Sequence, residues 1–322
     1  MKGIVVSGVV YKISVVLLAL ASAGACLADS ESTLKQMLKS SGLRVGYDRK
    51  EKRLVSIGVA ERRMSNPMMN AGFDKDRGDL AKIAILNAKK QLMFSISVEA
   101  SGKDVATETV VNDARAASVM SVMKLFSTME LRGCKVLCSA ESWDEAEGVF
   151  QVSVAMGWSE KMAVRANKAL SDSLKLDVLE LGDDDPQWIS WCEKNDLSTM
   201  VGCRQFTDTE GHLRFVGISA STVEGLSGIK LKMAMRKAGL NALGHLAFSL
   251  YSDNIAKDTA TRYLKEFESC GQSSTLSWES FTSEVLSKCK ATIMAHEVYS
   301  NTLTYPVTGR KMYVSVYGVA LK

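Results

Sequence analysis

An internal repeat is the feature of this sequence that most restricts how the chain can fold. The segment that begins at Asn87-Ala88 recurs without a gap from Asn241-Ala242. The shared positions are Leu92 and Leu246, Phe94-Ser95 and Phe248-Ser249, Lys103-Asp104 and Lys257-Asp258, and Ala106-Thr107 and Ala260-Thr261. Self-similarity of this kind indicates that one structural module is present twice.

Both copies predict a long helix with small side chains along one face. Every fourth position is apolar in each copy, and the two stripes are Leu80, Ala84, Ala88, Leu92 and Ile96, and Ala234, Ala238, Ala242, Leu246 and Leu250. Because alanine is small, a buried stripe of this kind lets the helix axis approach its neighbour closely. We therefore expect each long helix to lie on a β-sheet.

Apolar runs joined by polar turns predict β-hairpins before and after each long helix. The first hairpins turn at residues 48–52 and 208–211, and the closing ones at residues 144–145 and 306–309. A short helix is expected before each first hairpin, and another helix after each long one. Each copy therefore predicts an α+β domain with helices packed on one face of an antiparallel sheet.

The domain organisation follows from the repeat. We expect a signal peptide over residues 1–28, a first α+β repeat over residues 29–160, a connecting helix or linker over residues 161–186, and a second repeat over residues 187–322. Both repeats have the size of an ordinary domain.

The N-terminal segment has the layout of a secretory signal peptide. Lys2 and Lys12 precede a short apolar run over residues 13–21, which is followed by small residues. A membrane-spanning helix needs about 20 apolar residues, so the segment favours cleavage over a retained anchor. The stretch Ala23-Gly24-Ala25-Cys26 resembles a bacterial lipobox, which would make Cys26 a lipidation site and a membrane tether. Ordinary cleavage near this point is the alternative, and both predict a location in the periplasm or at the outer membrane.

Charge and motif content exclude several classes of function. Lysine and arginine number 40 against 36 acidic residues, and the net charge of +4 is too small for a strong field, so no nucleic-acid partner is expected. The three histidines, His212, His245 and His296, never approach metal-ligand spacing, and no phosphate-binding loop, dinucleotide fingerprint or serine-hydrolase motif occurs. We therefore expect no metal site, no cofactor and no catalytic residues.

The cysteines leave two interpretations open. Six remain without Cys26, and they are Cys134, Cys138, Cys192, Cys203, Cys270 and Cys289. Export permits disulfides, and buried free thiols fit equally well. Cys134 and Cys138 are four residues apart in an expected strand, which separates them by about 13 Å and prevents a bond between them. A cysteine activated by His212 or His296 would define a thiol-dependent enzyme.

Two pairs of side chains are candidates for binding a partner. Trp188 and Trp191 lie three apart on the short helix before the second hairpin, a spacing more typical of core packing than of an exposed anchor. Met68 and Met69 lie in the loop after the first hairpin, where the first copy is five residues longer than the second. Exposed tryptophans in a groove would indicate a module that binds a glycan or another small ligand.

A glycine-bearing strand, the alanine-rich helix around residues 84–92 and the closing Val152-Ser153-Val154 strand occur in this order. This order resembles that of bacterial envelope lipoproteins of the LPP-twenty type and of related periplasmic domains in flagellar assembly. The resemblance implies an exported α+β domain used for assembly or binding, and it implies no catalytic residues.

Together these observations predict a non-enzymatic envelope protein that acts as a scaffold or binding module for envelope protein partners or for self-assembly. An envelope hydrolase or thiol-dependent enzyme with a cleft between the repeats is one alternative. A glycan or small-ligand binding module is the other.

Overall fold

The computed structural model describes residues 29–48, 52–64, 66–67, 70, 72–100, 119–129, 131, 133–169, 178–179, 185–225, 227–270, 277–289 and 295–321. Cys26, Met68 and Met69 lie outside these residues, as does the expected signal peptide. Among the described helices, none combines the length and the apolar character that crossing a membrane requires.

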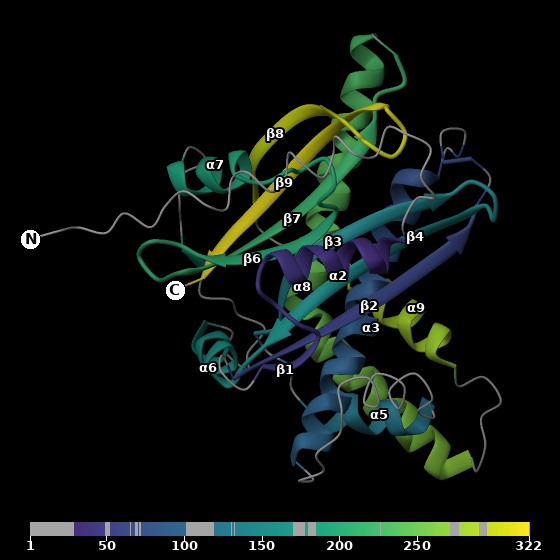
Figure 1. Ribbon diagram of the computed structural model, residues 1–322, viewed down its shortest axis with the longest axis vertical. Helices are drawn as coiled ribbons and strands as arrows, with labels where there is room; N and C mark the ends of the chain where they lie inside the picture. Colours follow the sequence, from purple (N-terminus) through teal and green to yellow (C-terminus); the bar gives the residue numbers. More distant parts are fainter. Residues whose placement is uncertain are drawn as a thin grey trace, which may run out of the picture.

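The first half of the chain forms a four-stranded antiparallel sheet with helices packed against it (Figure 1). Its elements are α2 (Ser30–Ser40), β1 (Gly46–Asp48), β2 (Arg53–Arg63), α3 (Phe73–Ala100), α5 (Val119–Thr128), β3 (Lys135–Asp144) and β4 (Val149–Trp158). The strand order is β1-β2-β4-β3, so the closing hairpin pairs with the opening one through β2 and β4.

The second half repeats this order of elements. They are α7 (Pro186–Glu193), β6 (Gly202–Thr207), β7 (Leu213–Thr222), α8 (Gly228–Cys270), α9 (Trp278–Lys288), β8 (His296–Thr304) and β9 (Lys311–Leu321). The sheet order β6-β7-β9-β8 is equivalent to that of the first half. The predicted α+β class, with two tandem antiparallel sheets and their helices, is confirmed.

The segment between the halves contributes to both. Helix α6 (Glu160–Ala169) follows β4 directly, and the short strand β5 (Val178–Leu179) pairs with the end of β9. Helix α7 begins as the sequence indicates, because Asp185 accepts a hydrogen bond from the Gln187 backbone N–H and Pro186 occupies the first turn.

Each long helix crosses its sheet at a glycine. A Cβ atom on Gly58 of β2 would lie 1.9 Å from the carbonyl oxygen of Ala84 in α3, and one on Gly217 of β7 would lie 2.0 Å from that of Ala242 in α8. No side chain fits at these distances, so the alanine stripe and the glycine together set the spacing between helix and sheet.

Helix α2 covers the opposite face of the first sheet. Leu34 and Leu38 are buried there against Val55 and Ile57 of β2, which alternate with the residues that face α3. The first sheet is therefore covered on both faces, an arrangement that the short helical pattern before the hairpin did not specify.

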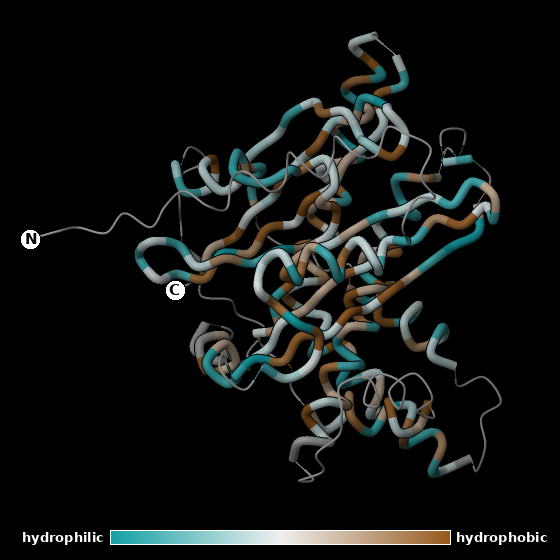
Figure 2. The backbone as a smooth tube through the Cα atoms, in the orientation of Figure 1, coloured by the Kyte–Doolittle hydropathy of each residue, from teal (hydrophilic) through white to brown (hydrophobic). Residues whose placement is uncertain are grey.

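The halves share one hydrophobic core. The first part of α8 packs on the second sheet, and its later part packs with α5 and α9 (Figure 1). Figure 2 shows the apolar residues of strands and helices converging in this interior. Lys89 of α3, which is buried, binds the Asp253 carboxylate of α8 at 2.5 Å and further ties the long helices together.

A candidate binding pocket at the seam of the two halves

A pocket lies where the two halves of the described chain meet, a junction here called the seam. This seam pocket has a volume of about 390 Å³, within the range of small-ligand sites. It is bounded by the start of α3, the end of β7, the start of α8 and the turn between β8 and β9. Its lining residues are Asn70, Asp74, Ser221, Thr222, Glu224, Lys230, Met233, Ala234, Lys237 and Arg310.

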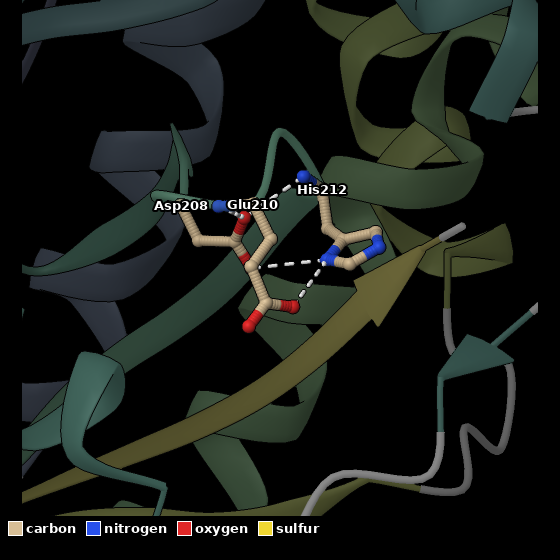
Figure 3. Close-up of side chains that lie close together, drawn as sticks. All are labelled: Asp208, Glu210 and His212. Atoms are coloured by element: carbon tan, nitrogen blue, oxygen red, sulfur yellow. Dashed lines mark hydrogen bonds and ion pairs between the residues drawn. The ribbon is translucent and has the colours of Figure 1, made fainter.

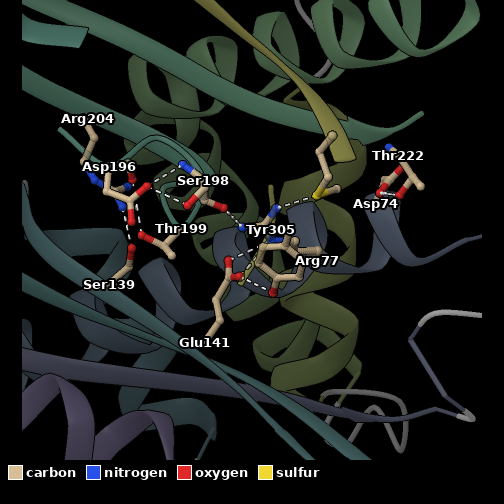
Figure 4. A network of polar contacts seen from close by, with 11 residues as sticks. Asp74, Arg77, Ser139, Glu141, Asp196, Ser198, Thr199, Arg204, Thr222 and Tyr305 are labelled. Carbon is tan, nitrogen blue, oxygen red and sulfur yellow. Dashed lines mark hydrogen bonds and ion pairs between the residues drawn. The ribbon is translucent and has the colours of Figure 1, made fainter. Parts of the chain in front are cut away.

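Asp74 joins the halves at the base of the seam pocket (Figure 4). One carboxylate oxygen accepts hydrogen bonds from the Ser221 hydroxyl at 3.1 Å and the Thr222 backbone N–H at 3.0 Å. The other accepts from the Thr222 hydroxyl at 3.1 Å. With both oxygens engaged, Asp74 acts as a structural clamp between α3 and β7.

The remaining charges of the pocket are mostly positive. Lys230, Lys237 and Arg310 line it, against one other carboxylate, that of Glu224. Across the described ranges, none of these three cations forms an ion pair with a side chain of the chain itself. The pocket therefore offers a net positive, solvent-accessible surface to an anionic group.

The turn that carries Arg310 is held by Tyr305. The Tyr305 backbone N–H donates to the Arg310 carbonyl at 2.8 Å, and the Gly309 N–H donates to the Tyr305 carbonyl at 2.8 Å. Gly309 has a φ of 66°, a left-handed conformation that glycine adopts without strain. The Tyr305 hydroxyl in turn donates to Glu141 of the first half at 2.6 Å, so the pocket rim is anchored across the seam.

A buried ion pair joins α3 to β3, and its arginine lies about one helical turn after Asp74 (Figure 4). The guanidinium of Arg77 in α3 donates to both carboxylate oxygens of Glu141 in β3 at 2.9 Å, and the two side chains are 1% and 4% exposed. Arg77 also donates to the Ser198 carbonyl at 2.9 Å and lies 4.1 Å from the centre of the Tyr305 ring. Burial lowers the pKa of Arg77, but the charge and hydrogen bond of Glu141, together with Tyr305 and Asp74, outweigh it and the pKa rises. Both members of the pair belong to the first half, and the bond from Arg77 to the Ser198 carbonyl and the bond from the Tyr305 hydroxyl to Glu141 link them to the second half.

A second contact joins the edges of the two sheets. Arg204 of β6 donates to the Ser139 hydroxyl of β3 at 2.6 Å and to the carbonyl of its neighbour Cys203 at 2.8 Å. Figure 4 shows these groups in line with the Arg77 network. Ionic and polar contacts from several strands therefore keep the seam closed around one geometry.

Asp208, Glu210 and His212 form the one group of metal-binding residue types found within the described ranges (Figure 3). His212 Nδ1 lies 3.4 Å from oxygens of both carboxylates. Asp208 already accepts from the backbone N–H groups of Glu210 and His212 and, at 2.8 Å, from Nε of Arg214. Since the Arg214 guanidinium neutralises Asp208 and would repel an ion, this group is a structured β-turn.

The cysteines differ from catalytic thiols in their surroundings. Cys134, Cys138, Cys192, Cys203 and Cys289 are free thiols, so none of these five forms a disulfide. Burial raises the pKa of Cys138 to about 11 and those of Cys192 and Cys289 to about 12. Thiols of this kind are protonated at neutral pH and are poor nucleophiles.

The tryptophans are packing residues. Trp188 is 2% exposed and lies under the Arg214 guanidinium, 4.6 Å from ring centre to Cζ. Trp191 is half-buried and stacks on Phe206 with ring centres 5.1 Å apart. Trp188 is therefore not the exposed partner-binding anchor considered from the sequence, because its ring is needed to cover the second sheet.

No residue of the seam pocket was identified as a candidate from the sequence. Its lining comes from separate segments that only the folded chain brings together. One signal was present, since no acidic residue occurs between Gly225 and Ser252, while Lys230, Lys232, Arg236 and Lys237 do. A basic segment of this kind at the start of a helix indicates a surface for anionic groups.

These features define a two-sheet α+β protein with a polar pocket at its internal junction. Neither a family model nor a curated protein matches the chain. A crystal structure of a hypothetical protein from Francisella tularensis is similar over 93% of this chain and 93% of that one, with 13% sequence identity and a TM-score of 0.48.

Proposed function

We propose that this protein is a non-enzymatic binding protein of the bacterial envelope, which holds an acidic segment of a protein partner in the seam pocket. The observation that carries the proposal is the convergence of Lys230, Lys237 and Arg310 on a pocket whose base is a satisfied carboxylate, that of Asp74. The export signal expected over residues 1–28 supports the envelope as its location.

The surroundings of the pocket favour binding over turnover. No histidine or cysteine lines it, and the buried thiols elsewhere have raised pKa values. The hydrogen bonds from Ser221 and Thr222 to Asp74 tie together the pocket walls contributed by β7 and α3. A fixed pocket reduces the entropic cost of binding an extended segment.

The test is calorimetric binding of two end-blocked peptides to the purified mature chain. One peptide alternates glutamate with glycine, and its matched control carries glutamine in place of glutamate. We expect the glutamate peptide to bind, and the double variant Lys237→Gln/Arg310→Gln to weaken this binding by about 10-fold or more, since each removes a charge-assisted contact. Lys35→Gln/Lys39→Gln on α2 removes equal charge far from the pocket and should leave the affinity unchanged.

The proposal would be overturned if the unaltered chain bound both peptides with equal affinity. It would also be overturned if Lys237→Gln/Arg310→Gln bound the glutamate peptide as tightly as the unaltered chain does. So would hydrolysis of peptide, ester or glycan substrates by the purified chain.

A further inference from the structure

The first three turns of α8 expose an unusual amount of apolar surface. Eight large hydrophobic side chains are exposed across the described residues, and five of them lie in one short stretch: Ile229, Leu231, Met233, Met235 and Leu240. Isolated exposed apolar residues are common, but a contiguous group of this kind marks an interaction surface. Residues 228–240 are here called the α8 tip.

The most exposed of these side chains form a stripe. Ile229, Met233 and Leu240 are 74%, 57% and 61% exposed. At about 100° per residue they fall within roughly 40° of one another, on the side of α8 opposite the buried Ala234 and Ala238. The stripe therefore points away from the body of the protein.

Basic side chains flank the stripe on both sides. Lys232 and Arg236 lie on the flank away from the seam pocket, and Lys230 and Lys237 lie on the flank that lines it. No acidic residue occurs between Gly225 and Ser252, so the α8 tip carries only positive charge. An apolar stripe between lysines and arginines is typical of helices that lie in a membrane interface.

The place of the α8 tip in the molecule fits a broad surface. In Figure 1 the start of α8 projects beyond the second sheet, at the upper end of the longest axis of the molecule. Figure 2 shows hydrophilic and hydrophobic residues alternating along this projection. A single projecting helix is convex, so it complements a flat, deformable surface better than it completes a groove.

We propose that the α8 tip docks on an anionic lipid surface, with Ile229, Met233 and Leu240 inserted among the acyl chains and Lys232 and Arg236 at the lipid phosphates. Met233 also lines the seam pocket, so the variants that test lipid binding are confined to Ile229, Lys232, Arg236 and Leu240, which do not line it. It would place the mouth of the pocket next to a membrane.

The experiment is co-sedimentation of the mature chain with vesicles of phosphatidylcholine alone or of phosphatidylcholine and phosphatidylglycerol in equal amounts. We expect binding to the anionic vesicles, little binding to the neutral ones, and a decrease with added salt. Lys232→Gln/Arg236→Gln should weaken binding on the order of 30-fold, at about fivefold for each charge. Ile229→Gln/Leu240→Gln should weaken it more than about 10-fold through lost apolar burial.

Two control variants match these changes in chemistry. Val164→Gln removes an exposed apolar side chain on α6, and Lys35→Gln/Lys39→Gln removes two exposed charges on α2. Both should bind vesicles as the unaltered chain does. Because every substituted position is exposed, circular dichroism and the unfolding midpoint should not change.

Several results would overturn the proposal. One is that the unaltered chain binds neutral and anionic vesicles equally. Another is that the α8-tip variants bind anionic vesicles as well as the unaltered chain does. Light scattering that shows a dimer of the unaltered chain and a monomer of Ile229→Gln/Leu240→Gln would assign the stripe to a second copy instead. If the unaltered chain binds anionic vesicles but does not bind the glutamate peptide, the seam-pocket proposal alone is contradicted.

Discussion

Ser56 of β2 and Gly217 of β7 occupy equivalent places in the two sheets. Val55, the residue before Ser56, pairs with Gly157 of β4. Val216, the residue before Gly217, pairs with Gly318 of β9. The two glycines are themselves equivalent, because each lies beneath a bulged residue of the neighbouring strand, Leu137 over Gly157 and Val298 over Gly318.

The contacts to the long helices agree with this equivalence. The Ser56 hydroxyl donates to the Ala88 carbonyl at 2.8 Å, and Gly217 lies against the carbonyl of Ala242, the residue that matches Ala88 in the repeat. The glycine at the closest approach and the serine therefore occupy exchanged positions in the two halves. The first half has Ser56-Ile57-Gly58, and the second has Gly217-Ile218-Ser219. The point of closest approach is displaced between the halves by two residues along the strand, about 6.6 Å, and by one turn of the helix, about 6 Å. Because these two displacements are nearly equal, the helix crosses the sheet similarly in both halves.

Substitution of either crossing glycine should be strongly destabilising. Gly58→Ala and Gly217→Ala each place a methyl group within about 2 Å of a helix carbonyl, which the backbone must move to accommodate. We expect each to lower the free energy of unfolding by about 2–3 kcal/mol or more, as measured in urea. Gly228→Ala is the control, since a Cβ there has no neighbour within 4 Å and its unfolding midpoint should be retained. Unchanged stability of the crossing variants would contradict the helix placement.

Removal of the Glu141 charge should destabilise the seam. Glu141→Gln leaves the buried Arg77 guanidinium charged without its counter-ion, at an expected cost of about 3–5 kcal/mol in unfolding free energy. The matched change Glu31→Gln affects a pair with Lys35 in which the two side chains are 24% and 59% exposed, and it should cost less than about 1 kcal/mol. If the two variants lost similar amounts of unfolding free energy, the Arg77–Glu141 pair would be as well solvated as the Lys35–Glu31 pair.

The described thiols should be unreactive in the folded state. With pKa values of about 11 and 12, Cys138, Cys192 and Cys289 have very small thiolate fractions at neutral pH, and burial also limits access. We expect alkylation by iodoacetamide at pH 7 to be at least about 100-fold slower than in urea, as followed by peptide mass spectrometry. One cysteine that reacts quickly in the folded chain would instead support the thiol-dependent enzyme.

The Glu284 cluster should make stability depend on acidity. Burial would raise the pKa of Glu284, but hydrogen bonds from Lys288, Tyr263 and Arg262 lower it to about 2. A carboxyl whose pKa falls on folding contributes stability that is complete above its unfolded value of about 4.3, and this contribution is lost as the pH falls towards 2.

Glu284→Gln should accordingly lower the unfolding free energy by about 1 kcal/mol at pH 7. The difference from the unaltered chain should shrink steadily below about pH 4. The measurement is a series of urea titrations across this range, with Glu145→Gln in the exposed turn between β3 and β4 as the control. A difference that is independent of pH would show that the lost packing, rather than the charge, accounts for the effect.

The sequence by itself determined the local elements. The alanine stripes around Ala84 and Ala238 indicated long helices on sheets, and the polar turns indicated the hairpins that the structure contains. Caps such as Asp185 before Pro186 marked where helices begin. These signals are readable because they depend on residues a few positions apart, where helix and strand periodicities act.

Only the tertiary structure decided which face of its sheet each helix covers, where the strands bulge and where the pocket forms. The opposite-face position of α2, the burial of Trp188, the Arg77–Glu141 pair and the seam pocket all depend on contacts between distant segments. Asp74 and Thr222 are 148 positions apart in the chain, and no local pattern in either segment indicates the other. Such contacts form because the shared hydrophobic core brings the two sheets together, and that packing is a property of the whole chain.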